Sequence, residues 1–138
     1  MCTKRSLKFP NGKSYVYDYK NQKIYVKLWI EVFSKIKILD NFVAKQTTPV
    51  NNLYIEVLSP ARLEELKSEK IATTFICDSY GKVKSVEFLF FKEPFLSVDE
   101  IERLEEAFLN YTFDLKVYGD KQDSNLYKFA IACFFSKL

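Results

Sequence analysis

The chain has 138 residues, of which 48% are hydrophobic and 17% aromatic, so it has enough apolar side chains for the core of one domain. It contains no histidine, which excludes Ser-His-Asp and Cys-His catalysis and most zinc sites. No apolar run approaches the roughly 20 residues of a transmembrane helix, and the first residues lack an apolar signal segment. We expect a single domain, residues 1–138, without a membrane span.

The net charge of +3 is unevenly distributed along the chain. Residues 1–58 hold ten Lys and Arg against four Asp and Glu, whereas residues 59–138 hold eleven against fourteen. We expect a basic, strand-rich first part and a helix-hairpin-helix-strand core in the second. The positive charges are scattered, which permits an acidic partner but favours a solvated surface, so nucleic acid is not the expected partner.

The first predicted elements are strands. Asn11-Gly12 signals a turn, and the proline in the preceding run, Leu7–Pro10, restricts any strand there to the edge of a sheet. Residues 14–20 alternate tyrosine with other side chains, which predicts a strand with one aromatic face.

Residues 24–33 show the clearest alternation in the chain and predict a long strand that pairs with residues 14–20. A helix over residues 28–38 is the competing interpretation, because Trp29, Phe33 and Ile36 also lie at helical spacing. The β-branched residues favour the strand.

Residues 46–49 predict a loop, and Leu53–Leu58 predicts a short strand. Ser59-Pro60 is typical of a helix N-cap followed by proline at the first helical position, so we expect a helix to about Ser68. Leu63 and Leu66 are expected to face inward.

The segment from Ile71 to Val117 carries the strongest folding signals. Two apolar runs within residues 71–91 flank Asp78–Lys82, where Gly81 can supply the positive φ of a hairpin loop. Ser97 and Glu100 stand at capping-box spacing and predict a helix that begins at Val98. The period changes near Asn110, where alternation over residues 111–117 predicts a strand.

After a polar loop at residues 119–125, the mostly apolar run Leu126–Phe135 predicts an interior strand covered on both faces. The fold class expected from these elements is α+β, a mainly antiparallel sheet with two helices packed on it.

Cys77 and Cys133 fit reduced thiols packed within strands, or a disulfide if the protein is exported and the two strands are neighbours. A mature chain cut at the modified cysteine of a bacterial lipoprotein would begin as this one does, with Cys2 near its start. The chain as written is expected to be cytoplasmic; a removed signal segment would make it periplasmic, with a lipid anchor at Cys2.

No catalytic or cofactor motif was found, and the acidic clusters at residues 64–65 and 99–106 are expected to cap helices and face solvent. We expect no enzyme activity, cofactor or metal. Four aromatic residues lie among lysines of the basic part and are the candidate partner contacts: Tyr15, Tyr17, Tyr19 and Trp29. Such rings cover a sheet against a helix or partner, or stack on a sugar or single-stranded nucleic acid.

Residues 60–113 resemble the C-terminal domain of the energy-transducing TonB protein, and small uncharacterised bacterial proteins of similar plan. The matching positions belong to a Pro-led helix, an Asp-x-x-Gly-Lys-Val turn, a helix start and a closing strand: Pro60, Asp78, Gly81, Lys82, Val83, Val86, Leu96, Asp99, Ile101 and Phe113. The resemblance implies a TonB C-terminal-like or ferredoxin-like arrangement from residue 53 onward. It also implies a periplasmic binding or scaffold domain that pairs strand edges with a partner.

The expected function is therefore a non-enzymatic interaction with a protein partner through a sheet edge or an aromatic face. The alternative is binding of a small molecule, glycan or single-stranded nucleic acid on the Tyr/Trp/Lys surface.

Overall fold

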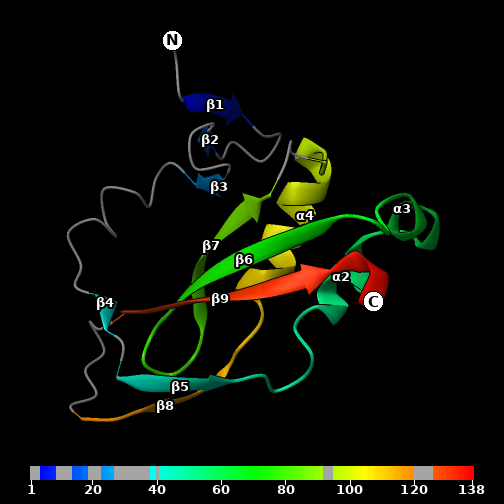
Figure 1. Cartoon of the computed structure of the whole chain (residues 1–138). Coiled ribbons are helices and arrows are strands. Elements are labelled where there is room, and N and C mark those ends of the chain that lie inside the picture. Colours follow the sequence, from blue (N-terminus) through cyan, green and yellow to red (C-terminus); the bar gives the residue numbers. More distant parts are fainter. Residues whose placement is uncertain are drawn as a thin grey trace.

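The computed structural model describes residues 4–8, 14–18, 23–26, 38–39, 41–91, 95–119 and 126–138. These residues have the expected α+β class, with a mainly antiparallel sheet, helices packed on it and a second, two-stranded sheet (Figure 1). None of the helices in these ranges is long and apolar enough to cross a membrane.

The larger sheet has seven strands in the order β1-β2-β3-β7-β6-β9-β4. All neighbours are antiparallel except β4, which runs parallel to β9. The strands are β1 (Lys4–Lys8), β2 (Ser14–Asp18), β3 (Lys23–Val26), β4 (Ile38–Leu39), β6 (Lys70–Cys77), β7 (Val83–Phe90) and β9 (Leu126–Phe134).

The first three strands follow the sequence pattern where they are described. β1 lies at the edge of the sheet, as the nearby proline predicts. β2 and β3 form the expected antiparallel pair, with Tyr15 opposite Val26 and Tyr17 opposite Ile24. Residues 27–33 of the predicted long strand, and residues 28–37 of the competing helix, lie outside the described residues.

The β6–β7 hairpin confirms the prediction for residues 71–91. The Asp78 carboxylate accepts hydrogen bonds from the backbone N–H groups of Tyr80 and Lys82, at 2.9 and 3.0 Å. Gly81 then takes a φ of +86°, a conformation that costs any residue with a Cβ.

The helix α4 (Val98–Leu109) begins with the predicted capping box. The Ser97 hydroxyl accepts from the Glu100 N–H at 3.1 Å, and the Glu100 carboxylate accepts from the Ser97 N–H at 2.9 Å. Two backbone donors that a helix start leaves unpaired are satisfied in this way. The helix ends at the predicted place, with Asn110 as its C-cap.

The helix α3 (Pro60–Glu65) also begins as predicted, because the Ser59 hydroxyl accepts from the Arg62 N–H at 3.2 Å. It ends at Glu65 rather than near Ser68, since the chain turns over residues 66–68. Leu66 is buried and Leu63 packs against the core, as expected.

The strand prediction for Leu53–Leu58 is wrong, because the segment forms the helix α2 (Asn52–Val57). Val50, Tyr54 and Leu58 are four residues apart and all buried, which is the spacing of one helix face. The β-branched Ile55 and Val57 favour a strand locally, but packing of Tyr54 overrides that preference.

Aromatic rings join these elements into one core on a single face of the large sheet. Phe75 of β6 lies edge-to-face against Phe108 of α4, at 5.4 Å between ring centroids, and against Phe113 at 5.0 Å. Phe108 also contacts Tyr54 of α2 and Phe88 of β7. The helices α2 and α4 therefore cover the same face of the sheet.

The second sheet pairs β5 (Phe42–Lys45) with β8 (Asp114–Val117). The strand predicted over residues 111–117 is present as β8 but begins only at Asp114, and its partner β5 is not among the predicted strands. The Phe42 ring packs on Tyr127 at 5.2 Å and on Phe129 at 5.8 Å, so this sheet also lies against the large one (Figure 1).

The strand β9 lies between β6 and β4, as predicted for an interior strand, but β4 pairs with it only at Leu126 and Tyr127, and β9 is covered on one face only. Phe129, Ile131 and Cys133 belong to the core or pack against it. The alternate positions are exposed: Lys128, Ala130, Ala132 and Phe134. A 3-10 turn over Phe135–Lys137 follows the strand.

We predict that Gly81→Ala destabilises the fold strongly. A Cβ on Gly81 would lie 1.9 Å from the Phe113 carbonyl oxygen, which is backbone and cannot turn away. Together with the positive φ this should lower the free energy of unfolding by more than about 2 kcal/mol. Gly119→Ala is the control. Gly119 also has a positive φ, of +103°, but a Cβ there would meet only the Asn41 amide nitrogen, at 3.3 Å. Denaturant unfolding that gives both variants the same loss would contradict this account.

Candidate functional site

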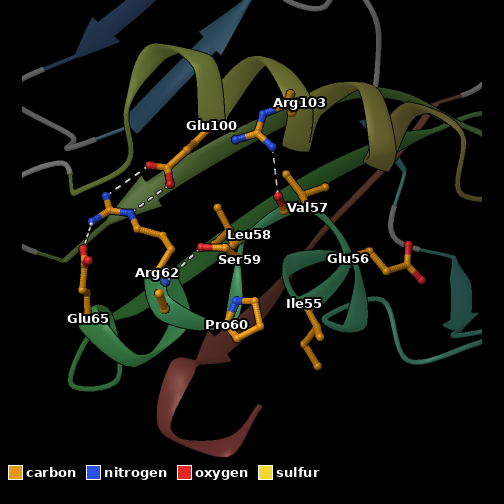
Figure 2. Close-up of a pocket in the computed structure, with 11 residues that line it drawn as sticks. Ile55, Glu56, Val57, Leu58, Ser59, Pro60, Arg62, Glu65, Glu100 and Arg103 are labelled. Atoms are coloured by element: carbon orange, nitrogen blue, oxygen red, sulfur yellow. Dashed lines mark hydrogen bonds and ion pairs between the residues drawn. The ribbon is translucent and has the colours of Figure 1, made fainter.

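An open depression of about 570 Å³ lies where α2, α3 and the start of α4 meet (Figure 2). Its lining includes two arginines and two carboxylates, Arg62, Arg103, Glu65 and Glu100.

The polar groups of this depression bond to one another. The Arg62 Nε and Nη2 atoms donate to the two oxygens of Glu100, at 2.9 and 3.1 Å, and Nη1 donates to Glu65 at 3.0 Å. Nη2 donates in addition to the Phe95 carbonyl. Four of the five guanidinium N–H groups are thus used inside the protein. Figure 2 shows the Arg62 and Glu100 side chains pointing toward each other.

This network fastens α3 to the N-terminal cap of α4. Burial opposes ionisation of Glu100, but hydrogen bonds from Arg62 and Ser97 outweigh it and hold the Glu100 pKa below its ordinary value. Arg103 is engaged similarly, with Nε on Asp99 at 2.9 Å and Nη1 on the Val57 carbonyl at 3.0 Å. The arrangement suits a structural clamp better than a ligand site.

The opposite face of the large sheet has a different character. We call it the open face: it is the surface of β7, β6 and β9 on which neither α2 nor α4 packs. The register places Ile71 opposite Phe90 and Cys133 within the core, so the alternate positions share the open face. They are Ser85, Glu87, Leu89 and Phe91 on or next to β7, Lys70, Ala72, Thr74 and Ile76 on β6, and Lys128, Ala130, Ala132 and Phe134 on β9. Ser85, Ala72 and Ile76 are buried, so this face is exposed mainly along β9 and at the end where Phe91 and Lys70 lie.

An aromatic row crosses this face at one end of the three strands. We define it as Phe91, Lys70 and Phe134, with Lys137 just beyond. Phe91 and Phe134 are 46% and 45% exposed, whereas phenylalanine is most often buried. The Lys70 ammonium lies 4.9 Å from the Phe91 ring centroid, and the Lys137 ammonium 5.3 Å from that of Phe134.

The row was not predicted from the sequence. Its members come from the start of β6, the end of β7 and the end of β9, and only the strand register brings them together. The sequence signal that bears on it is Lys128, since a charged residue in β9 indicates that one face of this strand is exposed. The prediction of a strand covered on both faces does not use that signal.

The predicted contact residues are only partly described. Tyr15 and Tyr17 lie on β2. Tyr17 is opposite Ile24 of β3, and Ile24 is opposite Phe88 of β7, which is a buried residue of the core. Tyr19 and Trp29 lie outside the described residues. Whether these four residues contact a partner stays a prediction.

The two buried cysteines lie on neighbouring strands but far apart. Cys77 is opposite Tyr127 and Cys133 is opposite Ile71, so the two thiols are at opposite ends of the β6–β9 pair. Six residues of strand separate them, on the order of 20 Å, which no disulfide can span. Both are free thiols, and burial raises the pKa of each to about 12.

We predict that Arg62→Met destabilises the protein by about 1–3 kcal/mol, because it leaves Glu100 partly buried without its partner. Arg103→Met is the control; the Arg103 side chain is 50% exposed, so its pair with Asp99 should contribute less than about 1 kcal/mol. Since the folded-state pKa of Glu100 is lowered, its contribution is present above the unfolded-state pKa and lost as pH falls through the folded one. Thermal unfolding between pH 7 and pH 3 should show less acid sensitivity in Arg62→Met than in Arg103→Met.

We predict that Cys77 and Cys133 resist maleimide labelling at pH 8 in the native protein and react fully in denaturant. A Cys2→Ser variant confines the measurement to these two thiols. Mass spectrometry that finds either thiol labelled in the native state as fast as free cysteine would contradict the buried placement.

Comparison with known proteins supports the fold and is silent on activity. No protein-family profile and no curated protein sequence matches the chain. The crystal structure of a DUF5043 family protein from Bacteroides uniformis matches with a TM-score of 0.59 and 15% identity, over 95% of this chain and 84% of that one. At this identity the likeness is one of fold.

Proposed function

We propose that the chain is a non-enzymatic binding domain that contacts a protein partner through the aromatic row of its open face. The observation that carries the proposal is the exposure of Phe91 and Phe134, about 45% each, on the side of the sheet that α2 and α4 leave uncovered. Exposed apolar surface of this kind typically marks an interaction site.

The row is a better candidate than the outer edge of β9. β4 pairs with β9 only at Leu126 and Tyr127, but farther along the Asn51 amide donates to the Ala132 carbonyl at 3.1 Å and so occupies that edge. Lys128 of the same strand is exposed, and an exposed lysine near a sheet edge discourages pairing with another strand.

The row is also a better candidate than the depression between the helices. There Arg62 and Glu100 already satisfy each other, so a ligand would have to break their bonds before it could form its own. The resemblance of residues 60–113 to TonB C-terminal domains also supports binding rather than catalysis, because it implies a binding or scaffold domain. A catalytic role has no comparable support among the described residues.

The proposal is tested with a photo-crosslinking amino acid placed at position 134, and at position 118 as the control. Tyr118 is 54% exposed and has a lysine over its ring, but it lies beyond β8, away from the row. In cells that express the chain, position 134 should crosslink to a protein that position 118 does not reach.

The identified protein is then purified and titrated against Phe91→Thr/Phe134→Thr and against Tyr118→Thr. Threonine suits strands, so the fold should be retained. We expect the double variant to weaken binding at least about tenfold, as loss of central aromatic contacts does, and Tyr118→Thr to leave it unchanged. Equal crosslinking at both positions, or equal affinity of both variants, would overturn the proposal.

A further inference from the structure

We infer that the segment bound by the aromatic row is an acidic, extended stretch of polypeptide whose carboxylates meet the ammonium groups of Lys70 and Lys137. The inference rests on the proposed function and specifies the chemistry of its partner. Three features point to it: the position of the two lysines over the rings, the lack of a described carboxylate beside their ammonium groups, and the small side chains next to them.

Each exposed ring already carries a lysine. With the Lys70 ammonium 4.9 Å from the Phe91 centroid and the Lys137 ammonium 5.3 Å from the Phe134 centroid, one face of each ring is occupied. A base or sugar would have to displace these ammonium groups to stack there. A carboxylate has no such conflict, because an ammonium group has three donors and those directed away from the ring remain available.

Among the described residues, no carboxylate pairs with the lysines on this part of the surface. No described carboxylate lies within 4.0 Å of the Lys70, Lys128 or Lys137 ammonium groups. This includes the carboxylate of Glu69, the neighbour of Lys70 in the chain. Elsewhere in the described residues, carboxylates lie within that distance of Arg62, Lys67, Lys84 and Arg103. Lys70, Lys128 and Lys137 outnumber Glu87, the carboxylate among the described residues of the open face, so the described part of this surface has an excess of positive charge.

The surface beside the row suits an extended main chain. Ala72 and Ala132 stand opposite each other one step along β6 and β9, and Thr74 stands opposite Ala130 in the row after that. Ala130 and Ala132 are exposed, whereas Thr74 is half-buried and Ala72 is buried, so the accessible small side chains are those of β9. Small side chains let a backbone approach closely, while the rings bordering them can hold an apolar side chain of the partner.

A second copy of the chain is a poor occupant of this face. A two-fold interface places the same patch on both subunits, and so would bring Lys70 and Lys137 of one copy against those of the other without carboxylates between them. Charge complementarity thus selects a different, negatively charged partner.

The experiment is a selection from a phage-displayed library of random dodecapeptides against the intact protein at low salt. We expect the selected peptides to be rich in Asp and Glu with interspersed apolar residues. For synthetic copies of these peptides, Lys70→Gln and Lys137→Gln should each weaken binding about threefold to tenfold. Lys70→Arg should retain it, since arginine keeps the charge and the contact with the ring. Raising the salt to 1 M should weaken binding similarly.

Lys116→Gln is the matched control, because the Lys116 ammonium also lies over an exposed ring, that of Tyr118 at 5.7 Å, on the other sheet. Peptides that need Phe134 but show no acidic bias, or that bind Lys70→Gln and Lys137→Gln with unchanged affinity, would overturn the inference and leave the proposed function standing. Peptides indifferent to Phe134→Thr would count against the proposed face itself. A selection that yields no binder, or a single-stranded oligonucleotide that binds through Lys70 where acidic peptides do not, would also overturn the inference.

Discussion

The edge-to-face contact between Phe75 and Phe108 is the point at which the layers of this protein meet. Phe75 belongs to the middle of the sheet and Phe108 to the last turn of α4, and each touches rings of further elements. Edge-to-face pairs contribute beyond the area they bury because the positive ring edge meets a negative ring face. Tyr54 adds a polar tie, with its hydroxyl 2.6 Å from that of Thr73. Without this cluster neither α2 nor α4 would have a fixed place.

The helices and the β5–β8 sheet pack on one face of the large sheet, and neither α2 nor α4 packs on the other. That division gives the open face its exposed alanines and phenylalanines. The clamp formed by Arg62, Glu100 and Ser97 belongs to the covered side and serves to fix α3. The contacts that hold the helices therefore lie on one side of these strands, and the surface proposed to bind a partner lies on the other.

The parts of the fold that the sequence predicts correctly depend on near neighbours in the chain. The turn at Gly81, the capping box of Ser97 and the Ser59-Pro60 start each need only a few residues. The wrong prediction at Leu53–Leu58 has a cause distant in the chain, since the packing of Tyr54 on Phe108 favours a helix there. The aromatic row has one as well, because Lys70 and Phe134 meet only through the β6–β9 register.

The position of β9 also bears on the order in which the protein can assemble. It is the last strand in the chain, yet it pairs with β6 along its whole length, from Lys70 opposite Phe134 to Cys77 opposite Tyr127. While the chain is being made, the β6–β7 hairpin has to wait with one long edge open until β9 leaves the ribosome. Such delayed, non-local pairing is slow and leaves nascent strands open to aggregation. The stability of the finished sheet thus comes with a vulnerable interval during synthesis.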